Sequence, residues 1–242
     1  MSSYSSLAAA LINVLGLERP PVAVSRVDTP PPNVSVFSGT VPSACSFWRL
    51  AEQKTFVAHD LDHMNCPVGA LTMGFTLTPE AKKGLDQGLA LMCQVGYLNP
   101  EEASYLPSLP GSSSSLLYGP LSQFPIEPKV VLVWLKPSQA MILQEATGDA
   151  EWRAEPASGV FGRPTCAALA VALREKNVAL SFGCAGMRIF TEIEPDYMLA
   201  VISHTLLDRL EENLNKTHKA NCLMQTHYLE QKNLIQNAGG MK

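Results

Sequence analysis

The pattern of apolar and polar positions along the chain predicts strands and helices that follow one another. The clearest strand is 129–135, whose continuous apolar character is typical of a strand buried on both faces. Further strands are predicted over 21–27, 55–58, 178–182 and 187–192. Helices are predicted over 7–17, 45–53, 66–74, 78–95, 137–146, 165–176 and 194–214. This interleaving favours a mixed α/β (α+β) fold around a buried sheet, with a long C-terminal helix.

Loop signals divide the chain into larger units. Pro, Ser and Thr dominate residues 28–42, and Pro, Gly and Ser dominate 106–115, which is the best candidate for an internal boundary. A chain of 242 residues is long enough for one large domain or two small ones. We therefore expect a single domain over 1–214 with an internal boundary near 106–115. Residues 215–242 are expected to form a ragged helix or a flexible tail.

Composition and charge exclude several classes of protein. The chain is 46% hydrophobic and 17% charged, with a net charge of -4 and no cluster of basic residues, so a nucleic-acid partner is not expected. No apolar run is long enough for a membrane span. The N-terminus lacks a secretory signal, which predicts a cytoplasmic protein. The partner classes left are a redox protein or a small-molecule ligand, and the oligomeric state is not indicated.

Four of the six cysteines share a local setting that favours chemistry. Cys45, Cys66 and Cys166 each stand where an irregular segment turns into a predicted helix, and Cys184 lies in a Gly-rich turn after a predicted strand. Backbone N–H groups in such places favour a thiolate. In a reducing cytoplasm these thiols would be metal ligands or catalytic groups rather than disulfides. We expect the sulfurs of Cys45, Cys66 and Cys184 to meet at one cavity.

Each cysteine could also simply pack in the core instead of binding a metal or acting in catalysis, because free cysteine is often a buried, small hydrophobic residue. Cys93 lies in the apolar run 89–93 and fits packing. Cys222 lies in a polar C-terminal segment and is expected to be an incidental thiol.

The segment His59-Asp60-Leu61-Asp62-His63 has two interpretations. On a helix its two imidazoles would share one face and could bind zinc. Helical apolar periodicity is missing around it, so a solvated loop leading to Cys66 is favoured. His63 would then lie close to whatever Cys66 binds.

Cys66-Pro67 also has two interpretations. Proline often follows a ligating cysteine in ferredoxin-type sites, and a Cys-Pro pair with a nearby histidine can place a thiolate on haem iron. A structural zinc site would favour Cys-x-x-Cys pairs, which the sequence lacks. Gly183 to Gly186 does not have the frame of a nucleophile elbow.

Four motifs in this order resemble the DUF169 family, which is found in archaea and anaerobic bacteria. They are Arg19-Pro20-Pro21-Val22-Ala23-Val24, Cys45-x-x-Trp48, Asp62-His63-Met64-Asn65-Cys66-Pro67-Val68-Gly69-Ala70 and Ser181-Phe182-Gly183-Cys184-Ala185-Gly186-Met187-Arg188. The resemblance covers about 11–214, so the domain over 1–214 is expected to be DUF169-like. It implies that Cys45, Cys66 and Cys184 match the family's motif cysteines, and it brings no established activity with it.

The first functional hypothesis is a [4Fe–4S] iron–sulfur cluster held by Cys45, Cys66 and Cys184, with Cys166 as the candidate fourth ligand. Three thiolates would leave one iron open to a substrate, whereas four would complete the cluster. The role would be in redox chemistry, in cluster transfer or in a cluster-dependent enzyme. Arg188 would bind an anion or balance the cluster charge, unless it forms an ordinary salt bridge.

Two alternatives come from other classes. One is a module in which Cys66, with His63, binds haem or another tetrapyrrole. The other is a metal-free cysteine enzyme with redox or acyl-transfer chemistry, in which only one or two of the thiols matter.

Overall fold

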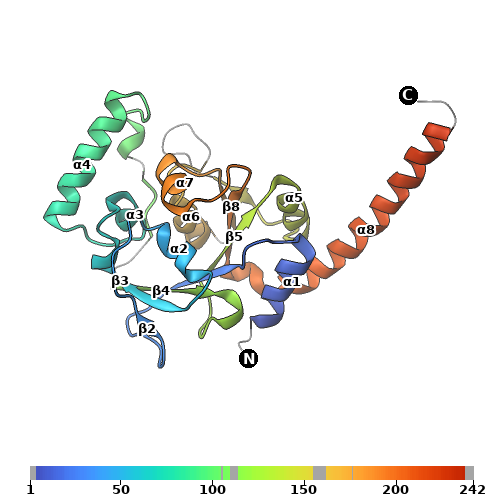
Figure 1. Cartoon of the computed structure of the whole chain (residues 1–242), viewed down its shortest axis with the longest axis horizontal. Helices are drawn as coiled ribbons and strands as arrows, with labels where there is room; N and C mark the ends of the chain where they lie inside the picture. The colour runs from blue at the N-terminus through green and yellow to red at the C-terminus, as the bar shows by residue number, and fades with distance from the viewer. Residues whose placement is uncertain (1–3, 105, 110–113, 155–161, 176, 238–242) are drawn as a thin grey trace.

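A mixed β-sheet runs through the middle of the molecule (Figure 1). The computed structural model describes residues 4–104, 106–109, 114–154, 162–175 and 177–237. In spatial order the eight strands are β2 (Ser35–Val36), β3 (Phe56–His59), β4 (Ser115–Pro120), β1 (Val22–Arg26), β5 (Val130–Leu135), β8 (Met198–Ser203), β7 (Val178–Ser181) and β6 (Trp152–Arg153). The β2–β3 and β6–β7 pairs at the two edges are parallel, and the other pairs are antiparallel.

Helices cover both faces of this sheet. One face packs against α1 (Ser5–Leu15), α5 (Pro137–Ala146) and the start of α8 (Leu207–Asn237). The other face packs against α2 (Ser46–Ala51), α3 (Pro67–Thr72), α6 (Ala167–Glu175) and α7 (Ala185–Thr191). The remaining long helix, α4 (Pro79–Gln94), lies outside α3 (Figure 1). Four short 3-10 helices complete the described elements: η1 (Asp60–His63), η2 (Glu102–Ser104), η3 (Leu121–Gln123) and η4 (His204–Leu206).

The central strand β5 confirms the prediction of a strand buried on both faces. All six of its residues are buried, with Leu132 and Trp134 in the core under α2 and α6, and Val131 and Val133 in the core under α1 and α5. Successive side chains of a strand point to opposite faces, so a central strand must be apolar throughout. The mixed α/β fold with a long C-terminal helix is therefore confirmed.

The predicted strand over 187–192 is wrong, because this segment is helix α7. Met187 and Thr191 are both buried, one turn apart, and the Thr191 hydroxyl donates to the Met187 carbonyl at 2.7 Å. Ile189 and Phe190 between them are exposed. A short apolar segment can fit both the helical and the strand period. Here the β-branched residues favoured a strand in the sequence.

The predicted helix over 194–214 is also wrong in its first half. Met198–Ser203 forms strand β8, which pairs with β5 along its whole length and with β7. Its apolar run carries no period that separates a buried strand from a buried helix. Helix α8 begins at Leu207, after η4, and continues to Asn237.

Strand β4 was not predicted, although it lies between β3 and β1. It begins at Ser115, at the end of the stretch 106–115 proposed as an internal boundary. Residues 110–113 of that stretch lie outside the described residues. Strands from both sides of it pair within the same sheet.

The helix α8 extends away from the body of the molecule (Figure 1). Its first turns bury Leu207, Leu210 and Leu214 against the sheet, and residues 222–237 are exposed. A ragged helix or tail was predicted from residue 215, but one helix runs to Asn237; residues 238–242 lie outside the described part. Within the described residues, no helix combines the length and apolar character of a membrane span.

Candidate functional site

Each of the four cysteines singled out by the sequence directly precedes a helix. Cys45, Cys66 and Cys184 are the N-cap residues of α2, α3 and α7, and Cys166 precedes α6. Each cysteine carbonyl accepts a hydrogen bond from the first helical turn, from Trp48, Ala70, Arg188 and Leu169 respectively. The four thiols therefore share one local setting, directly before a helix.

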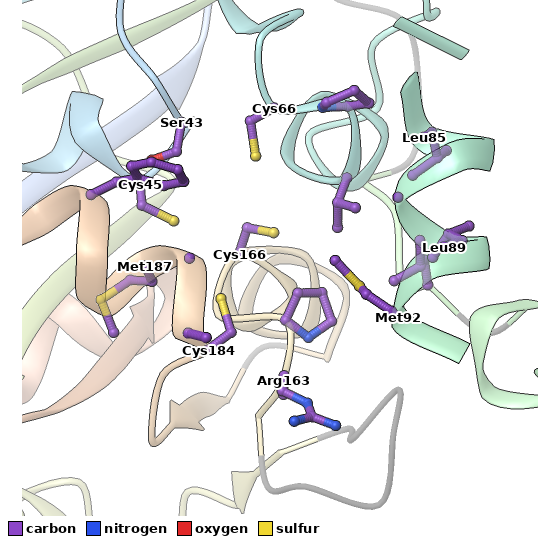
Figure 2. A pocket seen from close by; sticks show the side chains of 18 of the residues that line it. Ser43, Cys45, Cys66, Leu85, Leu89, Met92, Arg163, Cys166, Cys184 and Met187 are labelled. Atoms are coloured by element: carbon purple, nitrogen blue, oxygen red, sulfur yellow. The ribbon is translucent and has the colours of Figure 1, made fainter. Parts of the chain in front are cut away.

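These four helix starts meet at one cavity of about 360 Å³ (Figure 2). Cys45 and Cys166 are buried, and Cys66 and Cys184 are half-buried. Figure 2 shows the four sulfurs on one side of the cavity, with α4 on the opposite side. The three thiols expected to share a cavity do so, and Cys166 lies with them.

Small residues let these segments approach closely. A Cβ added at Gly69 would lie 2.6 Å from the Cβ of Ala44 and 3.0 Å from the sulfur of Cys66. The Asn65 amide donates to the Val41 carbonyl at 3.1 Å, which links the loop before α3 to the loop before α2. Gly69 and Asn65 thus hold Cys66 near Cys45.

One hydrogen bond links the segments that carry Cys166 and Cys184. The Cys184 N–H donates to the Thr165 hydroxyl at 2.8 Å, and Thr165 is fully buried. Gly183 precedes this contact with a φ of 92°, a left-handed conformation that favours glycine. The turn before α7 is therefore fixed against the start of α6.

Arg188 supports this turn instead of pointing into the cavity. Its guanidinium donates to the carbonyls of Phe182, Glu194 and Tyr197, each at 2.6 Å. It does not line the cavity. Its role in the structure is to position the Cys184 turn, and the role of anion ligand stays a prediction.

His63 lies in the core behind the cavity and does not line it. Its Nδ1 is 2.7 Å from the His59 carbonyl, which can only accept, so Nδ1 carries the proton and Nε2 accepts from the Tyr118 hydroxyl at 2.9 Å. Burial lowers the pKa of His63 to about 4, so the ring is neutral. The solvated loop predicted over 59–63 is wrong, because η1 buries His63 against Phe47 and Phe75.

Burial disfavours the ionised form of two of the thiols, Cys45 and Cys166. It raises the pKa of Cys45 and the pKa of Cys166 well above the usual range, and the neighbouring cysteines raise both further. These two thiols are therefore protonated at neutral pH unless a positive charge enters the cavity. A bound metal supplies such a charge and deprotonates its thiol ligands.

The four cavity thiols are not grouped closely enough to hold one metal ion. Among the described residues, no three His, Cys, Asp or Glu side chains are close enough together to hold a single ion. Tetrahedral zinc would need its sulfur ligands about 2.3 Å from the metal. The zinc interpretation of His59 to His63 also lacks support, because the Nδ1 of His59 lies 2.8 Å from the Ser115 hydroxyl.

The family model of DUF169, described as "Uncharacterised ArCR", matches residues 10–213. The chain belongs to the DUF169 family. No curated protein and no solved structure matches it. All four cavity cysteines of this DUF169 chain lie inside the matched stretch, and most of α8 lies outside it.

Two residues of the DUF169 site were missed by the sequence analysis. The guanidinium of Arg163 lies over the ring of Tyr97, 3.9 Å from the ring centroid, and donates to the Tyr97 carbonyl at 2.5 Å. The Tyr97 hydroxyl accepts from the Ala185 N–H at 3.2 Å. Both residues line the cavity and connect the end of α4 to the starts of α6 and α7. Their sequence separation left no local signal of this contact.

The other two cysteines lie away from this site. Cys93, on α4, does not line the cavity, and Cys222 is exposed on α8 with its sulfur 3.7 Å from Nε2 of His218.

Proposed function

We propose that this DUF169 protein binds an iron–sulfur cluster, [4Fe–4S], through Cys45, Cys66, Cys166 and Cys184. The observation that carries the proposal is the meeting of four helix-start thiols at one cavity. Soft thiolates are the usual ligands of iron–sulfur clusters, and four of them complete a [4Fe–4S] cluster.

The surroundings of the thiols fit a negatively charged group. The positive end of a helix dipole favours negative charge. A cluster with four thiolates carries such a charge, and here four helices begin around it. The cavity, with a volume of about 360 Å³, also has room for a group larger than one ion.

The role of the cluster follows from the ligand count. Four cysteine ligands favour one-electron transfer or cluster transfer, because no iron is then open to a substrate. If only three of them bind, the open iron would favour a cluster-dependent enzyme. Cys166 decides between these roles.

The alternatives draw less support from the site. Haem held by Cys66 would lack His63 as a partner, because both ring nitrogens of His63 are hydrogen-bonded in the core. A metal-free nucleophile needs a thiolate. Burial keeps Cys45 and Cys166 protonated, so a metal-free enzyme would have to rely on Cys66 or Cys184.

The test is anaerobic purification followed by iron, acid-labile sulfide and haem analysis, with an absorption spectrum. We expect iron and sulfide in similar amounts and a broad visible absorption. A sharp Soret band with iron and no sulfide would favour haem instead. A colourless, metal-free protein after anaerobic reconstitution with iron and sulfide would refute both.

A further inference from the structure

The cavity continues past the sulfurs to one face of α4, which forms a second wall. This wall consists of Leu85, Leu89 and Met92 with two glycines, Gly84 and Gly88. Figure 2 shows Leu85, Leu89 and Met92 across the cavity from the cysteines, with Met92 directed toward them. Residues at these spacings fall on one side of a helix. The apolar side of α4, which in most helices packs in a core, therefore faces a cavity.

The packing of α4 agrees with this arrangement. Ala81 is its one buried residue among those described, and Leu85, Leu89 and Met92 are half-buried. Of the other elements, α3 is the main neighbour of α4. An amphipathic helix gains most of its stability by burying its apolar face. A ligand in the cavity would supply the apolar contacts that α4 lacks.

Two glycines keep the α4 wall open. Gly84 and Gly88 stand one turn apart in the interior of the helix, where glycine is a poor helix former. Among the described residues, a Cβ added at Gly88 would meet no atom within 4 Å, and one at Gly84 would meet only Pro67, at 3.9 Å. No close contact therefore requires glycine at position 88. The missing side chain leaves space on the face that lines the cavity.

The lining determines the class of ligand. Arg163 is the one charged side chain among the described residues that line the cavity, and Tyr97 already contacts it. The α4 wall itself offers aliphatic and thioether groups. Small-molecule sites have volumes of about 300–1,000 Å³ and mostly apolar walls. The whole cavity, thiol side included, has about 360 Å³, so a ligand in its α4 half is a small one.

We infer that the α4 half of the cavity binds an uncharged, apolar organic molecule, held between Leu85, Leu89 and Met92 and the thiol wall. The inference rests on the proposed function only for the chemistry beside the ligand, where a cluster would be the neighbouring group. The binding itself is carried by the shape and lining of the cavity.

The test is a fluorescence titration of the full-length protein with the neutral apolar dye N-phenyl-1-naphthylamine. In Gly88→Leu, the new side chain fills the α4 half, and we expect the dissociation constant of the dye to rise about tenfold or more. The matched control is Ala90→Leu, which adds a leucine side chain to an exposed position of the same helix. It should change the constant by less than about twofold.

A second variant guards against misfolding. Gly88→Ala adds one methyl group and favours the helix, so it should fold, and its dissociation constant for the dye should lie between those of the unmodified protein and Gly88→Leu. No dye binding to the unmodified protein, or equal binding by Gly88→Leu and Ala90→Leu, would overturn the inference. Iron and sulfide are measured on the same samples. Dye binding by a protein that takes up no iron after anaerobic reconstitution would refute the proposed cluster alone, and iron without dye binding would refute the ligand alone.

Discussion

The four thiols of the cavity differ in how much protein surrounds them. Cys45 and Cys166 are 5% and 3% exposed, whereas Cys66 and Cys184 are half-buried. A buried hydroxyl without a partner costs about 1–3 kcal/mol, so serine at Cys45 or Cys166 should also lower the stability of the fold. Loss of a ligand and loss of the fold must therefore be measured separately.

We expect Cys45→Ser, Cys66→Ser and Cys184→Ser each to lower iron and sulfide content to roughly half or less, because a hydroxyl is a poor ligand for a cluster that selects soft thiolates. Cys166→Ser should do the same if Cys166 is the fourth ligand. The measurement is metal and sulfide analysis of folded, anaerobically purified protein. Cys222→Ser is the control, since Cys222 is exposed on α8. Full iron content in Cys66→Ser would contradict the assignment.

His63 predicts a dependence of stability on pH. Its pKa is lowered from 6.5 to about 4 in the folded protein, so the unfolded chain binds more protons between these values. The stability due to the neutral ring is complete above about pH 6.5, and falls as the pH drops toward 4. The full loss is about 3 kcal/mol. Urea unfolding at pH 7 and at pH 4.5 measures it.

The matched variants for this prediction are His63→Gln and His227→Gln. The first removes the buried titrating group, so its unfolding free energy should change less between the two pH values. The second changes a histidine on the exposed part of α8 and should keep the full pH dependence. Parallel pH curves for the unmodified protein and His63→Gln would show that His63 does not titrate as proposed.

Residues with a local signal could be placed from the sequence, and residues with distant partners could not. Proline or glycine lies within three residues of each of the four cysteines, and this marked the helix starts at Cys45, Cys66 and Cys166 and the turn at Cys184. His63 stands three residues before Cys66, yet its position depends on Tyr118, Phe47 and Phe75. Nothing near His63 in the sequence reveals those contacts.

At the scale of elements, an ion-pair network connects two of the cysteine helices. Arg19, before β1, contacts Glu52 at the end of α2 at 3.4 Å and Glu194 after α7 at 2.9 Å. Arg49 on α2 pairs with Glu52 and donates to the Thr191 carbonyl at the end of α7 at 3.1 Å. The network thus fixes α2 and α7, which carry Cys45 and Cys184, relative to each other.

We expect Arg19→Met to lower the unfolding free energy by about 1–3 kcal/mol, because it removes one cation from Glu52, whose side chain is 10% exposed. Chemical denaturation measures the change. Lys129→Met is the control: it breaks the exposed pair with Glu127 and should cost less than about 0.5 kcal/mol. Equal effects of the two substitutions would mean that the network does not hold the helices.

The predicted elements were correct where their period or their end signals were distinct. Helix α4 begins after Thr78, whose hydroxyl accepts from the Ala81 N–H, and α5 begins with Pro137. The segment of strand β8 was predicted as helix and that of helix α7 as strand, because short apolar runs fit both the helical and the strand period. Pairing with β5 and β7 decides β8, and that contact comes from residues far away in the chain.

At the scale of the molecule, the two faces of the sheet carry different groups of helices, and the cavity lies on one face only. The face under α1, α5 and α8 is a packed core, and the face under α2, α3, α6 and α7 carries the four thiols. The fold class followed from the interleaved pattern alone. The meeting of Cys45, Cys66 and Cys184 was expected from their setting, with Cys166 as a candidate fourth. Its place on one face depends on the strand order, which the sequence does not encode locally.

The distal part of α8 is expected to be dispensable for the cavity. Residues 222–237 are exposed, and the family match ends at 213. Removal of residues 222–242 should therefore change the midpoint of thermal unfolding by less than about 3 °C and leave iron content unchanged. Circular dichroism and metal analysis provide the two measurements.

The control for this truncation is a shorter chain that ends at residue 209. It also removes Leu210 and Leu214, which are buried in the core with α1 and α5, and each buried leucine contributes about 1.5–3 kcal/mol. This chain should unfold at a clearly lower temperature. The milder truncation could instead lower the midpoint as much as the shorter chain does. If this loss also becomes larger at higher protein concentration, the distal helix contacts a second copy of the chain. The exposed apolar residues Leu223, Met224, Tyr228, Leu234 and Ile235 would then be the first positions to substitute.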